Sequence, residues 1–97
     1  MSPKTDIYIN SFQLNILLND EKKRVYKYLI ENGIWCTTCQ EICTEGVKVE
    51  EIYLTRLNDI KIHGTCNKCE GKVTRVMEFG EDREFYQSAD KFRESIE

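Results

Sequence analysis

The sequence has little of what marks a flexible linker or a membrane span. Its 97 residues include one proline and five glycines, while 40% are hydrophobic. That composition predicts a folded chain rather than a disordered or low-complexity one. No apolar run approaches the roughly 18 residues that a transmembrane helix needs, and the charges at Lys4 and Asp6 are not those of a signal peptide. We therefore expect a single domain over residues 1–97, located in the cytoplasm and not in a membrane.

Basic charge and catalytic groups are also scarce. Lys and Arg total 14 against 17 for Asp and Glu, a formal net charge of −3 at pH 7. A nonspecific nucleic-acid binder has an overall positive charge, which this chain lacks. One histidine and scattered carboxylates make no catalytic triad, and no glycine loop for phosphate is present. We predict a non-catalytic protein and identify no small-molecule substrate.

Cysteine, in contrast, is frequent and regularly spaced. Four of the five cysteines form two pairs separated by 26 residues, Cys36-Thr-Thr-Cys39 and Cys66-Asn-Lys-Cys69. An odd number of cysteines in a reducing compartment argues against a closed disulfide framework. Two residues between cysteines let one tight turn aim both sulfurs at one ion. Two such turns complete the tetrahedron of thiolates that zinc prefers. The spacing predicts one structural Zn²⁺, with iron, disulfides or free thiols as the alternatives.

The pattern resembles that of the zinc ribbon, in which two such cysteine turns, called knuckles, clamp one zinc ion. The resemblance covers about residues 34–79 and implies that Cys36, Cys39, Cys66 and Cys69 are the ligands. Ribbon knuckles usually carry glycine after the second cysteine, where this chain has Gln40 and Glu70. The chain as a whole resembles small uncharacterised prokaryotic proteins with a ribbon between helices. Iron-binding rubredoxins, which also use two such knuckles, are a weaker resemblance and imply electron transfer.

Three further residues near the pairs have two interpretations each. Cys43 is either a small buried residue or a substitute ligand or redox-sensitive thiol beside the metal. His63 precedes Cys66 by three residues. It is therefore either a surface group or the fourth ligand of a site with three cysteines and one histidine. We expect Trp35 to pack in the core beside the first knuckle, with base stacking as the alternative.

Hydrophobic periodicity predicts an α+β fold with a small ribbon-like antiparallel sheet over residues 34–80. An N-terminal arm and helix (1–33) precede this sheet, and a C-terminal helix (81–97) follows it. Asn19 or Asp20 caps a helix over about 20–32, which ends at Gly33. Its expected apolar face is Val25, Tyr28 and Leu29. Residues 60–63 and 72–79 read as strands. Residues 47–57 fit a strand or a helix, and we favour the strand.

The C-terminal segment carries a regular apolar stripe. Phe85, Ala89, Phe92 and Ile96 stand at i, i+4, i+7 and i+11, which predicts an amphipathic helix over about 82–96. The stripe is too apolar to stay exposed. It therefore covers the sheet or the first helix of its own chain, or it binds a protein partner, which includes a second copy. The candidate interface residues are Phe85, Phe92 and Ile96.

These features predict a zinc-binding module that acts as a protein-interaction or regulatory adapter. Nucleic-acid binding, as in a transcription-related ribbon, is the alternative. Its evidence is a group of basic residues around the second knuckle. The candidate contacts are Lys61, Lys68, Lys72 and Arg75. Charged faces are more often only solvated, and nearby glutamates such as Glu50 and Glu51 dilute any positive field.

Overall fold

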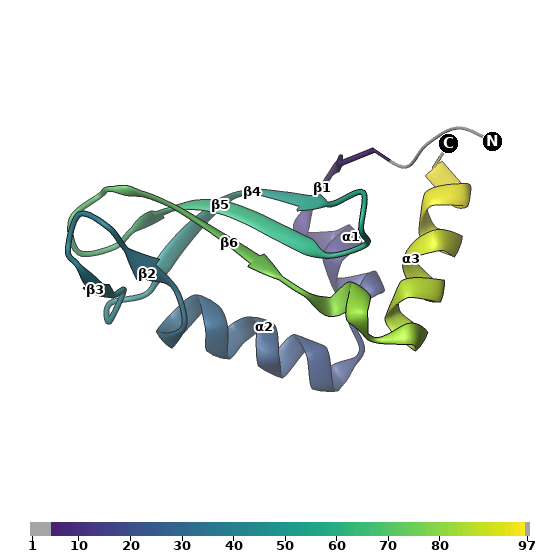
Figure 1. The fold of residues 1–97 in the computed structure, drawn as a ribbon, viewed down its shortest axis with the longest axis horizontal. Coiled ribbons are helices and arrows are strands. Elements are labelled where there is room, and N and C mark those ends of the chain that lie inside the picture. The colour runs from purple at the N-terminus through teal and green to yellow at the C-terminus, as the bar shows by residue number, and fades with distance from the viewer. Residues whose placement is uncertain (1–4, 97) are drawn as a thin grey trace.

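The computed structural model describes residues 5–96, so residues 1–4 of the expected N-terminal arm lie outside the described part. The elements, in chain order, are β1 (Ile7–Ile9), α1 (Ser11–Leu17), α2 (Asp20–Asn32), β2 (Trp35–Cys36), β3 (Glu41–Ile42), β4 (Val47–Leu54), β5 (Ile60–Cys66), β6 (Lys72–Met77), the 3-10 turn η1 (Phe79–Glu81) and α3 (Arg83–Ile96). The fold is α+β, as the periodicity predicts (Figure 1).

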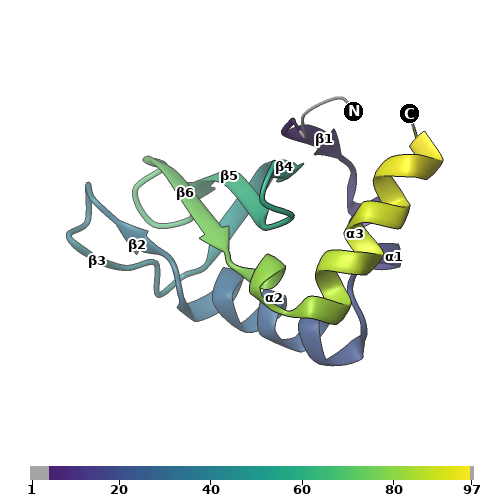
Figure 2. The same cartoon turned by 45° about the vertical axis from the view of Figure 1, so that its right-hand side comes forward.

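Four antiparallel strands form the main sheet in the order β1-β4-β5-β6, and β2 pairs with β3 in a separate hairpin. The molecule is elongated, with principal extents of 43 × 26 × 22 Å. The hairpin β2-β3 lies at one end of the long axis and α3 at the other, while α2 runs along one face of the sheet (Figures 1 and 2). The sheet therefore links the two ends of the molecule.

Strand β5 shows the alternation that its sequence predicts. Ile60, Ile62 and Cys66 are buried on one face of the sheet, whereas Lys61 and His63 lie on the opposite, outer face. The strand continues to Cys66, beyond the predicted 60–63. Val47–Leu54 is a strand, which confirms our preference for most of the segment 47–57, whereas residues 55–57 belong to the turn before β5. The last predicted strand is shorter than expected, because β6 ends at Met77 and η1 begins at Phe79.

Helix α2 has the predicted bounds but not the predicted apolar face. The Asn19 side chain caps it by accepting from the Lys22 amide at 2.8 Å. Val25 and Tyr28 are exposed, while Tyr26, Leu29 and Ile30 pack against the core. The buried face is rotated by about one residue, or about 100°. This correction has a packing cause, because two overlapping apolar stripes exist and contact with the sheet selects one.

Helix α1 forms within the apolar stretch that precedes Asn19. Asn10 and Gln13 build a capping box, in which each side chain accepts from the other residue's amide at 2.8 and 2.9 Å. Its inner face buries Leu14 and Leu17 in the core.

Helix α3 packs mainly on α1 and η1, whereas we expected it to cover the sheet or the Val25–Tyr28–Leu29 face of α2. Asp82 caps it by accepting from the amides of Glu84 and Phe85 at 2.9 and 3.2 Å. Phe85 is buried in the core, which removes it from the candidate interface, while Phe92 is half-buried and Ile96 is exposed. The prediction that the stripe covers the chain's own core therefore holds for its first half.

The third buried position of α3 is Arg93, which follows Phe85 and Ala89 at four-residue spacing. Its guanidinium donates to the side chain of Asn58 and to the backbone carbonyls of Thr5 and Thr55. Asn58 itself is fully buried and adopts a left-handed φ of 60° in the turn between β4 and β5. Arg93 thus ties α3 to this turn and to the chain before β1.

Candidate metal centre

The first cysteine pair sits in the turn between β2 and β3. The Gln40 amide donates to the Cys36 carbonyl at 2.8 Å, and the Cys39 amide points at the Cys36 sulfur at 3.4 Å. Gln40 has a φ of 56°, the left-handed conformation that glycine usually supplies. The turn therefore keeps the knuckle geometry although its sequence lacks the usual glycine.

The second pair repeats this design in the turn between β5 and β6. The Glu70 amide donates to the Cys66 carbonyl at 2.9 Å, and Glu70 has a φ of 61°. The Gly71 amide donates to the Cys69 sulfur at 3.3 Å. A Cβ on Gly71 would lie 2.8 Å from the Thr38 hydroxyl of the first knuckle. The two knuckles therefore approach so closely that a side chain at this position would force Thr38 to shift.

The two turns bring four sulfur atoms together. The Sγ atoms of Cys36, Cys39, Cys66 and Cys69 all lie within 4.8 Å of one another. The Cys36 and Cys69 sulfurs are 3.5 Å apart, and those of Cys39 and Cys66 are 4.0 Å apart. These distances far exceed the roughly 2.05 Å of a disulfide. A tetrahedron with metal–sulfur bonds of about 2.3 Å has edges of about 3.8 Å, so the cluster has the size of a metal–thiolate site.

The electrostatics of the cluster favour thiolate at one cysteine of each pair. The amides of Cys69 and Lys68 donate to the Cys66 sulfur and lower its pKa to about 6. In the other knuckle, the Cys39 amide lowers the pKa of Cys36 below its ordinary value. Hydrogen bonding with the Cys69 thiol raises the pKa of Cys39. Backbone amides that stabilise thiolate charge are what a metal–thiolate site requires.

The other candidate ligands do not join the four. Cys43 is buried beside the cluster, where burial raises its thiol pKa to about 12 and its thiol hydrogen-bonds with Cys66 and Cys36. Cys43 is therefore a buried residue outside the group of four sulfurs, and a role as substitute ligand or redox-sensitive thiol stays a hypothesis. His63 lies on the outer face of the sheet and its Nδ1 is 3.0 Å from the Thr74 hydroxyl. Strand alternation turns it away from Cys66, so the site with three cysteines and one histidine is wrong.

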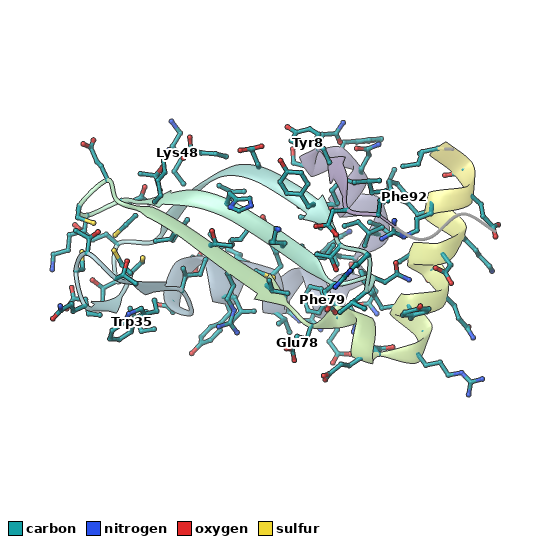
Figure 3. The ribbon with its side chains drawn as sticks, turned by 45° about the horizontal axis from the view of Figure 1, so that its top comes forward. Tyr8, Trp35, Lys48, Glu78, Phe79 and Phe92 are labelled. Carbon is teal, nitrogen blue, oxygen red and sulfur yellow. The ribbon has the colours of Figure 1, made fainter. Side chains whose placement is uncertain are left out.

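Trp35 also differs from expectation. It is 55% exposed, so it is not a core residue. Because Cys36 points inward from the short strand β2, alternation directs its neighbour Trp35 outward. Figure 3 shows Trp35 at the end of the molecule where the sulfur atoms gather, far from Phe79 and Phe92.

The four basic candidates for nucleic-acid contact are spread over different surfaces. Lys61 and Lys72 lie on the outer sheet face, whereas Arg75 pairs with the buried Ile62 and belongs to the other face. Lys68 stands in the second knuckle. Each lysine is near an acid, with Lys68–Glu41, Lys72–Glu50 and Lys61–Asp6 at 2.8, 3.0 and 3.8 Å. The expected basic cluster is therefore not one continuous patch.

Neither the helices nor comparisons with known proteins add evidence on what the site does. None of the helices within residues 5–96 combines the length and apolar character that crossing a membrane requires. No protein-family model, no curated protein and no solved structure matches the chain. The zinc ribbon therefore remains a resemblance. The structure itself establishes a cluster of four cysteines at metal-binding distance, built by two knuckles of the same backbone design.

Proposed function

We propose that the chain is a non-catalytic zinc-binding module, in which one structural Zn²⁺ holds the two knuckles together and the domain acts as a protein-interaction adapter. The observation that supports the metal site is the convergence of four sulfur atoms, none of them in a disulfide, within 4.8 Å of one another. Zinc is favoured over a rubredoxin-like iron because those iron sites are surrounded by aromatic side chains. Here the adjacent Trp35 points to solvent.

A closed set of four thiolates leaves no position for water, so the ion would stabilise the fold rather than hydrolyse a substrate. Structural zinc contributes on the order of 10 kcal/mol of apparent binding free energy. A domain of this size has a total stability of about 5–15 kcal/mol. Folding of the knuckle end would therefore depend on the ion.

The adapter role is supported by apolar side chains at the opposite end of the molecule. Phe12 and Ile16 of α1 and Ile96 of α3 are all exposed large hydrophobic residues. Helices α1 and α3 lie away from the hairpin β2-β3 along the long axis (Figure 1). Metal binding and partner binding would therefore use separate surfaces.

Elemental analysis of chain purified without chelator tests the metal. We expect about one zinc per chain, no iron and a colourless protein. Cys66→Ser should lose the ion and much of the thermal stability, whereas the matched variant Cys43→Ser should keep the ion. Wild-type protein that is folded, fully reduced and free of metal would overturn the proposal. A red protein with stoichiometric iron would instead favour electron transfer as the function.

Nucleic-acid binding is the second candidate, because the outer sheet face carries a row of rings. Tyr8 and Tyr53 meet edge to face at 5.8 Å, and Tyr53 meets His63 at 5.7 Å. Exposed rings on a sheet can stack on bases. We rank this role lower because the lysines on this face are matched by acids such as Glu50 and Glu51. A labelled single-stranded oligonucleotide that shows no anisotropy change in low salt up to about 100 µM protein would exclude it.

A further inference from the structure

Helix α1 is apolar on both of its faces. Leu14 and Leu17 point into the core, while Phe12 and Ile16, one turn apart, are 71% and 62% exposed on the outward side. Single exposed apolar residues are normal on a protein surface. The outward side of a surface helix normally carries polar residues, and in α1 this side carries an apolar pair as well as the exposed Ser11 and Asn15. The outward side of α1 is therefore a candidate contact surface.

A groove lies beside this surface, between α1 and α3. Its volume is about 340 Å³, with Ile16 and Leu17 on one wall and Phe92 on the other. Leu17 and Ser88 also line a smaller adjoining hollow of about 60 Å³ toward the start of α3. The polar residues of α3 along these two hollows are Glu84, Ser88, Lys91 and Ser95. The apolar residues Phe12 and Ile16 and this groove together form what we call the α1/α3 face.

The charges along α3 indicate what this face binds. Glu84 and Lys91 are seven residues apart, so they lie on the same side of the helix, about 10.5 Å from each other along its axis. Ser88, a small residue, stands between them. A twofold axis that crosses α3 near Ser88 places Glu84 of each copy opposite Lys91 of the other. The α1/α3 face thus supplies its own complement in charge, which favours a second copy of the chain over an unrelated protein.

We propose that the α1/α3 face is a homodimer interface, in which two α3 helices pack antiparallel about a twofold axis near Ser88. Phe12 and Ile16 of each copy then cover the groove of the other. This interface rests on the proposed adapter function, and the partner of the adapter is then a second copy of the chain. It does not depend on the metal, because the knuckles lie at the other end of the molecule.

Sedimentation velocity of the full, metal-loaded chain over a dilution series tests the interface. We expect the wild type to be a dimer and Phe12→Glu to be a monomer with an unchanged circular-dichroism spectrum, since Phe12 is not part of the core. Tyr28→Glu is the matched control, because Tyr28 is also an exposed aromatic residue but lies on α2. It should remain a dimer. A monomeric wild type, or a dimer that survives Phe12→Glu, overturns the proposal.

Charge exchange tests the antiparallel arrangement. Glu84→Lys and Lys91→Glu should each weaken dimerisation at least about tenfold, because each places like charges opposite one another. The double variant Glu84→Lys/Lys91→Glu should recover wild-type affinity. Failure of that recovery overturns the twofold near Ser88. The zinc content of the same samples reports separately on the proposed function, since a metal-free dimer and a zinc-loaded monomer refute different statements.

Discussion

Replacing Arg93 with methionine gives a sharp test of how the helical end is held together. Arg93 is only 5% exposed. Its Nε donates to Asn58 Oδ1 at 2.8 Å, its Nη1 to the Thr5 carbonyl at 2.7 Å, and its Nη2 to the Thr55 carbonyl. Methionine keeps most of the apolar stem but provides no donor. Asn58 Oδ1 and the Thr5 carbonyl therefore lose the bond from Arg93, and the Thr55 carbonyl keeps only its bond from the Asn58 amide at 2.8 Å.

The three acceptors do not contribute equally to the expected loss. A buried acceptor without a partner costs about 1–3 kcal/mol. Asn58 is fully buried, so its oxygen cannot be rescued by water, whereas the two carbonyls are only partly buried and water can replace part of their bonds. Removing a buried guanidinium also relieves some desolvation. We expect a net loss of about 3 kcal/mol, which corresponds to a melting temperature lower by about 12–24 °C for a domain of this size.

Urea denaturation at constant metal concentration measures this loss. Arg83→Met is the matched control, because Arg83 is exposed at the start of the same helix and its replacement should change stability by less than about 0.5 kcal/mol. Arg93→Lys should fall between the two, since it keeps the charge but has one nitrogen instead of three. If Arg93→Met and Arg83→Met unfold within about 0.5 kcal/mol of each other, Arg93 does not hold the three segments together.

Further predictions concern the knuckles and the cap of α3. Gln40→Gly and Glu70→Gly should each stabilise the metal-loaded protein by about 1 kcal/mol in urea denaturation, because both residues have a left-handed φ. Gln87→Gly, inside α3, should destabilise it by a similar amount. The Lys22 ammonium, and then the Phe85 amide, lower the pKa of Asp82. Its stabilising effect is therefore present at neutral pH and lost as the pH falls through that lowered value. Asp82→Asn should lower the melting temperature at neutral pH, and the difference from wild type should vanish in acid.

Much of the fold could be predicted because its signals are local. Alternation identified β5 and favoured a strand over a helix at β4, and the expected cap at Asn19 or Asp20 indicated the start of α2. The paired spacing of the cysteines identified the four converging sulfurs, since each pair needs only its own turn. The positive φ at Gln40 and Glu70 shows that knuckle geometry dictates the backbone even where the sequence departs from glycine.

Two errors and one omission depend on what a residue packs or pairs with, which periodicity alone does not show. Val25 and Tyr28 fit a helical stripe, but the sheet selects the neighbouring stripe instead. Trp35 is apolar, yet the pairing of β2 with β3 directs it outward. Arg93 was missed because arginine is rarely buried, and its acceptors come from residues far away in sequence. Its position four residues after Ala89, in line with Phe85, was the signal available in the sequence.

Strand β5 gives the elongated shape a thermodynamic consequence. It begins at Ile60, two residues after Asn58, and ends at Cys66, so one strand runs from the Arg93 contacts to the sulfur cluster. A ligand that binds only the folded state adds its binding free energy to the stability of the fold. In return, a change that destabilises the fold weakens the apparent binding of the ligand. A metal bound at one end would therefore raise the resistance of the helical end to urea. Arg93→Met, at the far end of a 43 Å molecule, would lower the apparent metal affinity without touching a ligand.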